Sequence, residues 1–176
     1  ERLQLMLRQQ RLDCIATTNE SSGEGAFFSD VYIRYQNVAV ALADRRLDIE
    51  RISDLSRFSV STFQRARLLL GSEFQQMAEH NPGYREEAFQ IARNRLLYIG
   101  RVDVVVGDLR ILRYFNHEVA GQVDVSQPLT IYPLFPPTAY RLGCSRAADC
   151  QRFNLGLAAI RKSGEYAAIE QRYAGY

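Results

Sequence analysis

The sequence predicts an α/β fold built as two similar lobes. Residues 102–106 form the clearest strand pattern, and an amphipathic helix pattern follows directly from Asp108. Residues 38–43 are apolar on both faces, as expected of a buried central strand. The segments 7–15 and 97–105 share one unit, a helix, an Arg-hydrophobe-Asp triplet and a buried strand. A strand, a tight turn and a helix are typical of α/β proteins, and the recurrence of the unit indicates two lobes of the same construction.

The first part of the chain alternates between helix and strand patterns. We expect first a helix, whose apolar residues are Leu3, Met6 and Leu7, then a strand at 12–16 and a polar loop at 19–25. The buried strand at 38–43, a turn at 52–55 and a strand at 58–61 follow. Ser72 and Gln75 form a capping-box pattern, which predicts that a helix begins at Ser72, after a short helix at 66–70. His80-Asn81-Pro82-Gly83 ends that helix.

The second part is predicted in the same way. A helix at about 86–99 presents an apolar face that includes Ala88, Ile91 and Leu96, and Gly100 closes it. After the strand at 102–106 and the helix that follows it, we expect an extended segment at 127–138, a short strand at 140–143, and helices at about 148–161 and 165–174.

Composition excludes several classes of protein. The chain has 176 residues, 47% hydrophobic and 24% charged, with a formal net charge of +2. No apolar run approaches the ~20 residues that span a bilayer, and the mean hydropathy is −0.25, so we expect no membrane-spanning segment. The 22 basic and 20 acidic residues are interspersed along the chain, which argues against a nucleic-acid partner.

The motifs of most catalytic and metal sites are absent from the sequence. His80 and His117 are the only histidines, and neither has the spacing of a metal ligand. The sequence contains no phosphate-binding loop and no Gly-x-Ser-x-Gly elbow. We therefore predict no cofactor, no metal and no catalytic residues.

The three cysteines leave two alternatives open. Cys144 and Cys150 lie six positions apart, a spacing compatible with a disulfide that closes a small loop and equally with three reduced cysteines. Cys14 stands alone in an apolar run. A disulfide would indicate an oxidising compartment.

A series of short motifs resembles a known family. In order they are the Arg-hydrophobe-Asp triplet with the strand after it, Phe28-Ser29-Asp30-Val31-Tyr32, the strand at 38–43, Ser53-Asp54-Leu55, Phe63-Gln64 before a helix, Gly100-Arg101-Val102-Asp103 with Asp108, and Leu157 to Gly164 before the final helix. In this order the chain resembles the family 3 extracellular solute-binding proteins of bacterial ABC importers. The resemblance implies a two-lobed type II periplasmic-binding-protein fold. It also implies that the first strand, helix and strand of lobe one, and a signal peptide, precede Glu1.

The resemblance also implies an organisation and a function. Lobe one would be residues 1–38 and 139–176, lobe two residues 43–133, with hinge crossings near 35–41 and 134–140. The protein would bind a small polar or anionic, amino-acid-like solute between the lobes and deliver it by hinge closure to the membrane permease of an ABC importer. A periplasmic location follows, which favours the Cys144–Cys150 disulfide. A ligand-sensing domain of a signalling system is the alternative, and a dehydratase-like enzyme on the same fold is a third possibility.

Ligand-binding residues are implied at matching positions. In lobe one they are Thr17, Thr18, Asn19, Ser22 and Tyr32, and in lobe two Gln64, Arg65, Ala66, Arg67 and Asp108. Asp108 would face a ligand ammonium group, or it would only cap the helix that follows it. Asp13 and Asp103 are expected to be architectural.

The chain departs from the family pattern at two places. Amino-acid binders of this family usually hold the ligand carboxylate with an arginine in the loop after the first strand, and this chain has no arginine between Arg11 and Arg34. Gln64-Arg65-Ala66-Arg67 stands where the family often has Gln-Gly-Thr-Thr at a helix N-terminus. Arg65 or Arg67 would then bind a carboxylate from lobe two, or both side chains would point to solvent.

Overall fold

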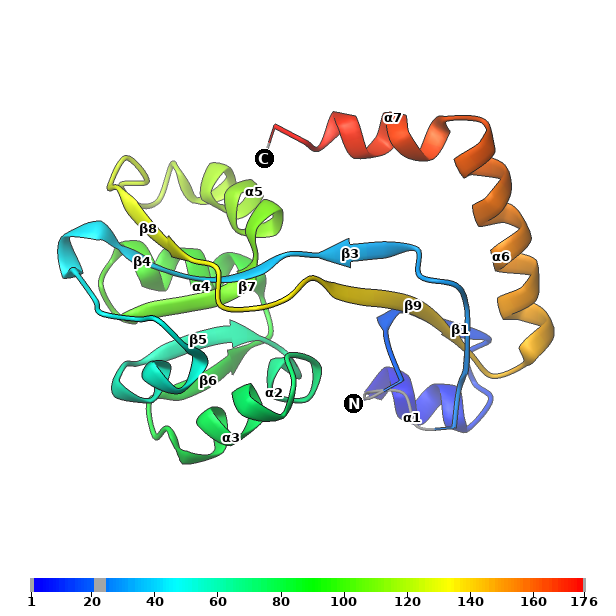
Figure 1. The fold of residues 1–176 in the computed structure, drawn as a ribbon, viewed down its shortest axis with the longest axis horizontal. Coiled ribbons are helices and arrows are strands. Elements are labelled where there is room, and N and C mark those ends of the chain that lie inside the picture. Colours follow the sequence, from blue (N-terminus) through cyan, green and yellow to red (C-terminus); the bar gives the residue numbers. More distant parts are fainter. Residues whose placement is uncertain (1, 21–24, 176) are drawn as a thin grey trace. The chain divides into compact units, whose positions relative to one another are not determined.

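A computed structural model describes residues 2–20 and 25–175 (Figure 1). The chain divides into two compact units. Unit 1 comprises the chain up to Tyr35 together with Thr138–Gly175, and unit 2 comprises Gln36–Pro137. The chain passes from one unit to the other within the two segments where the sequence analysis places its crossings, and a working hinge there stays a prediction.

Unit 2 is built on a mixed sheet of five strands in the order β6-β5-β7-β4-β8. The strands are β4 (Asn37–Leu42), β5 (Val60–Phe63), β6 (Tyr84–Glu87), β7 (Val104–Asp108) and β8 (Leu129–Tyr132). β5 runs parallel to β6 and β7, and β4 runs antiparallel to β7 and β8. Every residue of β4 and β7 is buried, which confirms the buried strands predicted at 38–43 and 102–106.

Helices cover both faces of this sheet (Figure 1). On one face lie the 3-10 helix η2 (Ile52–Arg57), α2 (Ala66–Leu69) and α3 (Ser72–His80), whose apolar side chains pack with those of Val60, Val104 and Val106. The other face packs Val38, Val40 and Val105 against α4 (Gln90–Tyr98) and α5 (Leu109–Val119). A short 3-10 helix, η1 (Ala43–Arg45), follows β4.

Two expectations for unit 2 are wrong. Residues 84–87 form strand β6 and not the start of a helix, because their backbone pairs in parallel with β5, a contact far along the chain that outweighs helix-forming composition. Helix α4 therefore begins at Gln90. It buries Arg93, Asn94, Leu97 and Tyr98, and Ile91 and Leu96 of the expected apolar face pack half-buried against the same core. Gly100 closes this helix with a positive φ of 67°, as predicted.

The capping box at Ser72 is also absent. The residue that precedes α3 is Gly71, with a φ of 96°, and no side chain caps the helix there. Ser72 is the first helical residue, so its side chain is one position too far along the chain to act as the cap.

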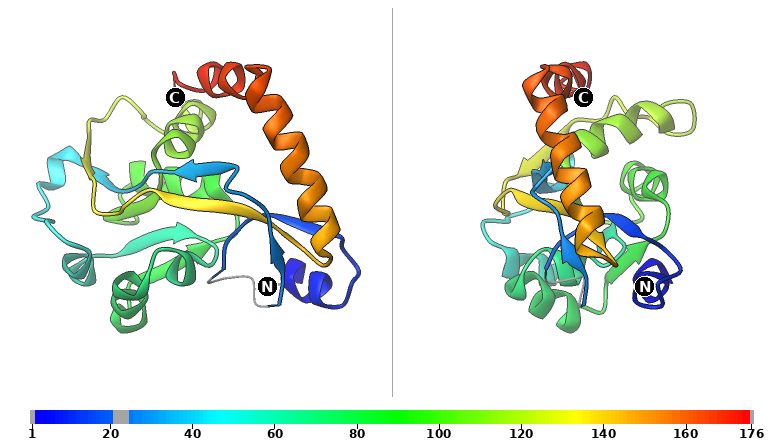
Figure 2. Two further views of the ribbon diagram at one scale, coloured as in Figure 1. Left: turned by 45° about the vertical axis from the view of Figure 1, so that its right-hand side comes forward. Right: turned by 90° about the vertical axis from the view of Figure 1, so that its right-hand side faces the viewer.

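Unit 1 is organised around one long strand, β9 (Thr138–Cys144). It pairs antiparallel with β1 (Cys14–Thr18), β2 (Phe27–Phe28) and β3 (Ile33–Tyr35). Within the described part of the chain, β1 pairs with β9 alone. Three helices complete the unit, α1 (Arg2–Arg8), α6 (Ala147–Lys162) and α7 (Glu165–Arg172). The chain bends between α6 and α7 at Ser163–Gly164, as predicted (Figure 2).

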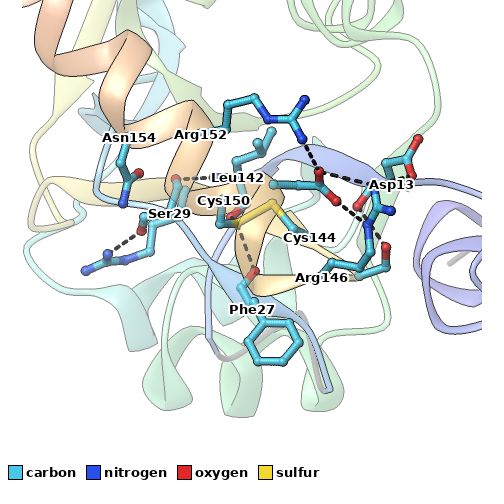
Figure 3. The surroundings of a disulfide bond; sticks show 12 residues. Asp13, Phe27, Ser29, Leu142, Cys144, Arg146, Cys150, Arg152 and Asn154 are labelled. Carbon is cyan, nitrogen blue, oxygen red and sulfur yellow. Dashed lines mark hydrogen bonds and ion pairs between the residues drawn. A yellow bond between two sulfur atoms is a disulfide. The ribbon is translucent and has the colours of Figure 1, made fainter.

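A disulfide joins Cys144, at the end of β9, to Cys150 in the first turns of α6 (Figure 3). The bridge confirms the pairing that the resemblance favours, and Cys14 is free. Burial, followed by the negative charges of Asp149 and Asp13, raises the pKa of the Cys14 thiol. The thiol is therefore a weaker nucleophile than an ordinary cysteine at neutral pH.

Candidate functional site

In unit 1 the predicted residues gather at the carboxyl end of β1. Thr17 has a φ of 56°, an outlier for a β-branched residue, and such strained residues concentrate at functional sites. Its backbone N–H donates to the Tyr32 hydroxyl at 2.9 Å, and the two hydroxyl oxygens lie 3.2 Å apart. Thr18 is buried and Asn19 half-buried beside them, whereas Ser22 lies outside the described residues.

Two helices hold Tyr32 in place. Its ring packs edge-on against Phe153 of α6, with centroids 5.7 Å apart. Its carbonyl accepts a hydrogen bond of 2.5 Å from the hydroxyl of Tyr166 in α7. Tyr32 therefore positions Thr17, and the structure brings together two residues that lie fifteen positions apart in the sequence.

An arginine that the sequence analysis does not name lies beside this group. Arg141 of β9 is the cross-strand partner of Thr18, so their side chains lie on the same face of the sheet. Its Nε lies 3.0 Å from Oε1 of Glu20, and its Nη1 donates to the Ser29 carbonyl at 2.6 Å. The Arg141 side chain is 31% exposed and that of Glu20 is 64% exposed, so solvent reaches the pair. The strand register, which no short sequence pattern reveals, is what places this guanidinium at the end of β1.

In unit 2 the segment after β5 does not form an open anion site. Arg65 adopts the left-handed conformation with a φ of 67°, Gln64 and Arg67 are exposed, and Ala66 is buried. The helix that follows, α2, has only four residues.

A carboxylate of the chain itself occupies the N–H groups at the start of α2. Oε2 of Glu86 accepts from the Arg65 N–H at 2.6 Å, and Oε1 accepts from the Arg67 N–H at 3.4 Å. The Tyr84 hydroxyl donates to Oε1 at 2.8 Å, and burial, together with this hydrogen bond, raises the pKa of Tyr84. Glu86 therefore occupies backbone N–H groups in the same segment where the sequence predicts that Arg65 or Arg67 binds a ligand carboxylate.

Asp108 caps α5, which confirms one of its two predicted roles. Its Oδ1 accepts from the N–H groups of Arg110 and Ile111 at 3.0 and 3.1 Å, and its Oδ2 accepts from that of Gln36 at 2.8 Å. The residue is buried, and a contact between its carboxylate and a ligand stays a prediction.

Next to this cap, a buried arginine packs on a glycine of β7. The Arg93 guanidinium donates to the Val106 carbonyl at 2.8 Å and to Oε1 of Gln90 at 2.7 Å, and burial lowers its pKa to about 10. A Cβ atom on Gly107 would lie 2.5 Å from Nη1 of Arg93. The absence of a side chain at Gly107 therefore makes the room that this buried cation occupies.

Among residues 2–20 and 25–175, no group of three or more His, Cys, Asp or Glu side chains is arranged to hold a metal ion. No helix in that part of the chain combines the length and apolar character needed to cross a membrane.

Comparison with known proteins bears on the fold. No protein-family model and no curated protein matches the sequence. One similar solved structure is the arginine-, lysine-, histidine-binding protein ArtJ from the thermophilic bacterium Geobacillus stearothermophilus, with a TM-score of 0.75 and 15% identity over 99% of this chain and 74% of that one. Another is a histidine kinase sensor domain with similarity to periplasmic binding proteins, with a TM-score of 0.79 and 20% identity over 99% and 75% of the two chains.

A third is an ancestral amino acid-binding protein described as a precursor of cyclohexadienyl dehydratase, with a TM-score of 0.68 and 18% identity over 97% of this chain and 72% of that one. At these identities the likeness establishes the fold. The predicted fold class is therefore confirmed: the chain is similar to amino-acid-binding proteins in having the two-lobed type II periplasmic-binding-protein fold.

Proposed function

We propose that the chain binds a small, amino-acid-like solute through its carboxylate and delivers it in the periplasm to the permease of an ABC importer. The observation that carries the proposal is the guanidinium of Arg141 at the carboxyl end of β1, beside Thr17, Thr18 and Asn19. Ligands of open α/β sheets bind beyond the carboxyl ends of strands. The shared fold supports the same class of function.

Arg141 suits a carboxylate for a physical reason. A guanidinium pairs with a carboxylate through two parallel N–H bonds, and the present partner, Glu20, is an exposed side chain. Exposed ion pairs contribute about 0–1 kcal/mol, so a solute carboxylate can replace Glu20 at little cost. The hydrogen bond from Nη1 to the Ser29 carbonyl keeps the guanidinium oriented during that exchange.

The charges of unit 2 support an amino-acid-like solute over a purely anionic one. Glu86 places a negative charge at the start of α2, where Arg65 and Arg67 carry positive ones, so the segment offers charges of both signs, as a solute with an ammonium and a carboxylate requires. Gln64, Arg65, Ala66, Arg67 and Asp108 remain proposed ligand-binding residues in this unit, and hinge closure around the solute remains part of the proposal.

Calorimetric titration with L-arginine, L-lysine and L-histidine, the amino acids in the description of ArtJ, tests the role of Arg141. For whichever of them binds, Arg141→Met should weaken binding about 10- to 100-fold, because a charge-assisted hydrogen bond contributes about 1.5–3 kcal/mol. Arg141→Lys keeps the charge but loses the paired geometry, so its loss should be intermediate. The matched control is Arg152→Met, which removes an 80% exposed arginine from α6. Equal affinities of Arg141→Met and the parent chain would contradict the proposal.

Sensing is the second candidate function, favoured by the likeness to the histidine kinase sensor domain. The full-length sequence and the gene neighbourhood separate the two. A sensor domain is continuous with a signalling module, whereas a transport protein is encoded beside a permease.

A further inference from the structure

All three cysteines of the chain lie in unit 1, and the fold brings them together at one end of β9. Cys144, the last residue of β9, is bonded to Cys150 of α6, and their Cα atoms are 5.9 Å apart. Cys14, the first residue of β1, is the register partner of Cys144 on the neighbouring strand. Cys144 therefore has two cysteine neighbours, one that is bonded to it and one that carries a free thiol.

The hydrogen bonds between β1 and β9 define how close Cys14 and Cys144 lie. The Ser145 N–H donates to the Asp13 carbonyl at 2.8 Å, so these two residues form a hydrogen-bonded pair. Along an antiparallel ladder such pairs alternate with non-hydrogen-bonded pairs, whose Cα atoms lie about 4.5 Å apart. Cys14 and Cys144 are the next pair along, so they belong to this closer kind. Since a disulfide spans Cα atoms about 4.4–6.8 Å apart, Cys144 can bridge to Cys14 as well as to Cys150.

The Cys14 side chain also lies on the side of the sheet that faces α6. Side chains of directly opposite residues share one face, and that of Cys144 points to α6 because its disulfide partner belongs to this helix. The carboxylate of Asp13, the residue before Cys14, lies 3.4 Å from the guanidinium of Arg146 at the start of α6 (Figure 3). The charge of Asp149, in the first turn of α6, acts on the Cys14 thiol. The thiol and the disulfide are therefore neighbours at the start of this helix.

We propose that the three cysteines form a thiol–disulfide exchange site, in which the bridge moves from Cys144–Cys150 to Cys14–Cys144. The Cys14 thiolate attacks Sγ of Cys144, the bond from Cys144 to Cys150 breaks as the new one forms, and Cys150 leaves as a thiolate that takes up a proton. One thiol and one disulfide are present before and after, so the step needs no oxidant or reductant. Cys150 is suited to leave, because it lies near the N-terminus of the 16-residue helix α6, which stabilises a thiolate.

Protonation of Cys14 keeps this exchange slow at neutral pH. Burial and the negative charges of Asp149 and Asp13 raise the pKa of the thiol, and the opposing charge of Arg146 has the smallest effect of the four. Because the thiolate is the attacking species, the exchange should quicken about tenfold for each pH unit until that pKa is reached. The product has β9 bonded to β1 in place of α6.

Trypsin places each cysteine in its own peptide, which makes the exchange measurable. The peptides are 12–34 with Cys14, 142–146 with Cys144, and 147–152 with Cys150. The parent chain is incubated at pH 7 and at pH 9, denatured at pH 5 with excess N-ethylmaleimide, and mapped without reduction by mass spectrometry. We expect label on Cys14 alone at the start. After incubation we expect label on Cys150 as well, together with a disulfide between the other two peptides. The initial rate at pH 9 should be at least 10-fold that at pH 7 and independent of protein concentration, because the exchange occurs within one chain.

The matched control is the double variant Cys14→Ser, Ser163→Cys. It keeps one thiol in unit 1, at an exposed position about 20 Å along α6 from Cys150, so its label should stay on position 163. Three results would overturn the proposal: label that stays on Cys14 alone at pH 9, transfer at a rate that rises with protein concentration, and equal transfer in the control. The site includes none of the residues proposed for the solute, so the outcome is independent of the proposed function.

Discussion

Replacing Gly107 with alanine should destabilise unit 2 strongly, because the new Cβ would lie 2.5 Å from Nη1 of the buried Arg93. That guanidinium is held by the Val106 carbonyl and by Gln90, so it cannot swing away without losing a buried hydrogen bond. Overpacking a core typically costs about 1–3 kcal/mol, and a disturbed charge-assisted hydrogen bond adds to that cost. We expect Gly107→Ala to lower the free energy of unfolding by about 2–4 kcal/mol.

The sign of the effect should reverse when the arginine is removed. In an Arg93→Met background the Cβ meets a flexible apolar side chain, and alanine within a strand is favoured over glycine by about 0.5–1 kcal/mol. Gly107→Ala should then be neutral or stabilising. Gly121→Ala is the matched control in unit 2, because a Cβ there meets no atom within 4 Å.

Urea unfolding followed by far-UV circular dichroism gives these free energies for the parent, both single variants, the double variant and the control. A coupling of about 3 kcal/mol between positions 93 and 107 is expected. If Gly107→Ala costs the same in both backgrounds, within about 0.5 kcal/mol, the contact between Gly107 and Arg93 does not explain the glycine.

Three further outcomes follow from the structure. Asp108→Ala should lower the free energy of unfolding by about 2–4 kcal/mol, because it leaves the N–H groups of Gln36, Arg110 and Ile111 without their acceptor. Asp108→Asn keeps Oδ1 as the helix cap but replaces the Oδ2 that accepts from Gln36, so it should cost about 1–2 kcal/mol, and equal losses in urea unfolding would refute the cap. Denatured, unreduced protein should show one reactive thiol, that of Cys14, and three reactive thiols after reduction. Cys150→Ser removes the disulfide and opens a short loop, so it should lower the free energy of unfolding by about 2 kcal/mol. Burial acts to raise the pKa of Asp103, but hydrogen bonds from Ser59 outweigh it and lower the pKa below the ordinary 3.8. The ionised carboxylate therefore stabilises the fold at neutral pH, and this stabilisation is lost as the pH falls through the lowered pKa. Asp103→Asn should flatten the acid limb of stability against pH, and an unchanged limb would show that Asp103 contributes nothing.

Strands and breaks that depend on local pattern were predictable from the sequence. The apolar runs at 38–42 and 104–106 form the centres of β4 and β7, since a strand buried on both faces is apolar over most of its length. Gly100 and Gly164 mark helix boundaries because both adopt positive φ values.

The elements that depend on distant partners were not predictable in this way. The polar strand β6 exists because it pairs with β5, and its composition alone indicates a helix. That error also concealed Glu86, which acts from β6 on the start of α2. Arg141 could not be predicted from the loop after β1 or from the segment that holds Arg65 and Arg67, because the register between β1 and β9 brings this cation from far along the chain.

The most direct test of the central claim is a thermal-shift series on the parent chain with the twenty amino acids and their decarboxylated amines. Recognition through a carboxylate predicts that at least one amino acid raises the melting temperature in a saturable way, and that the corresponding amine does not. An amine that stabilises the chain as strongly as its amino acid, or a complete absence of stabilisation by all twenty, would contradict the claim.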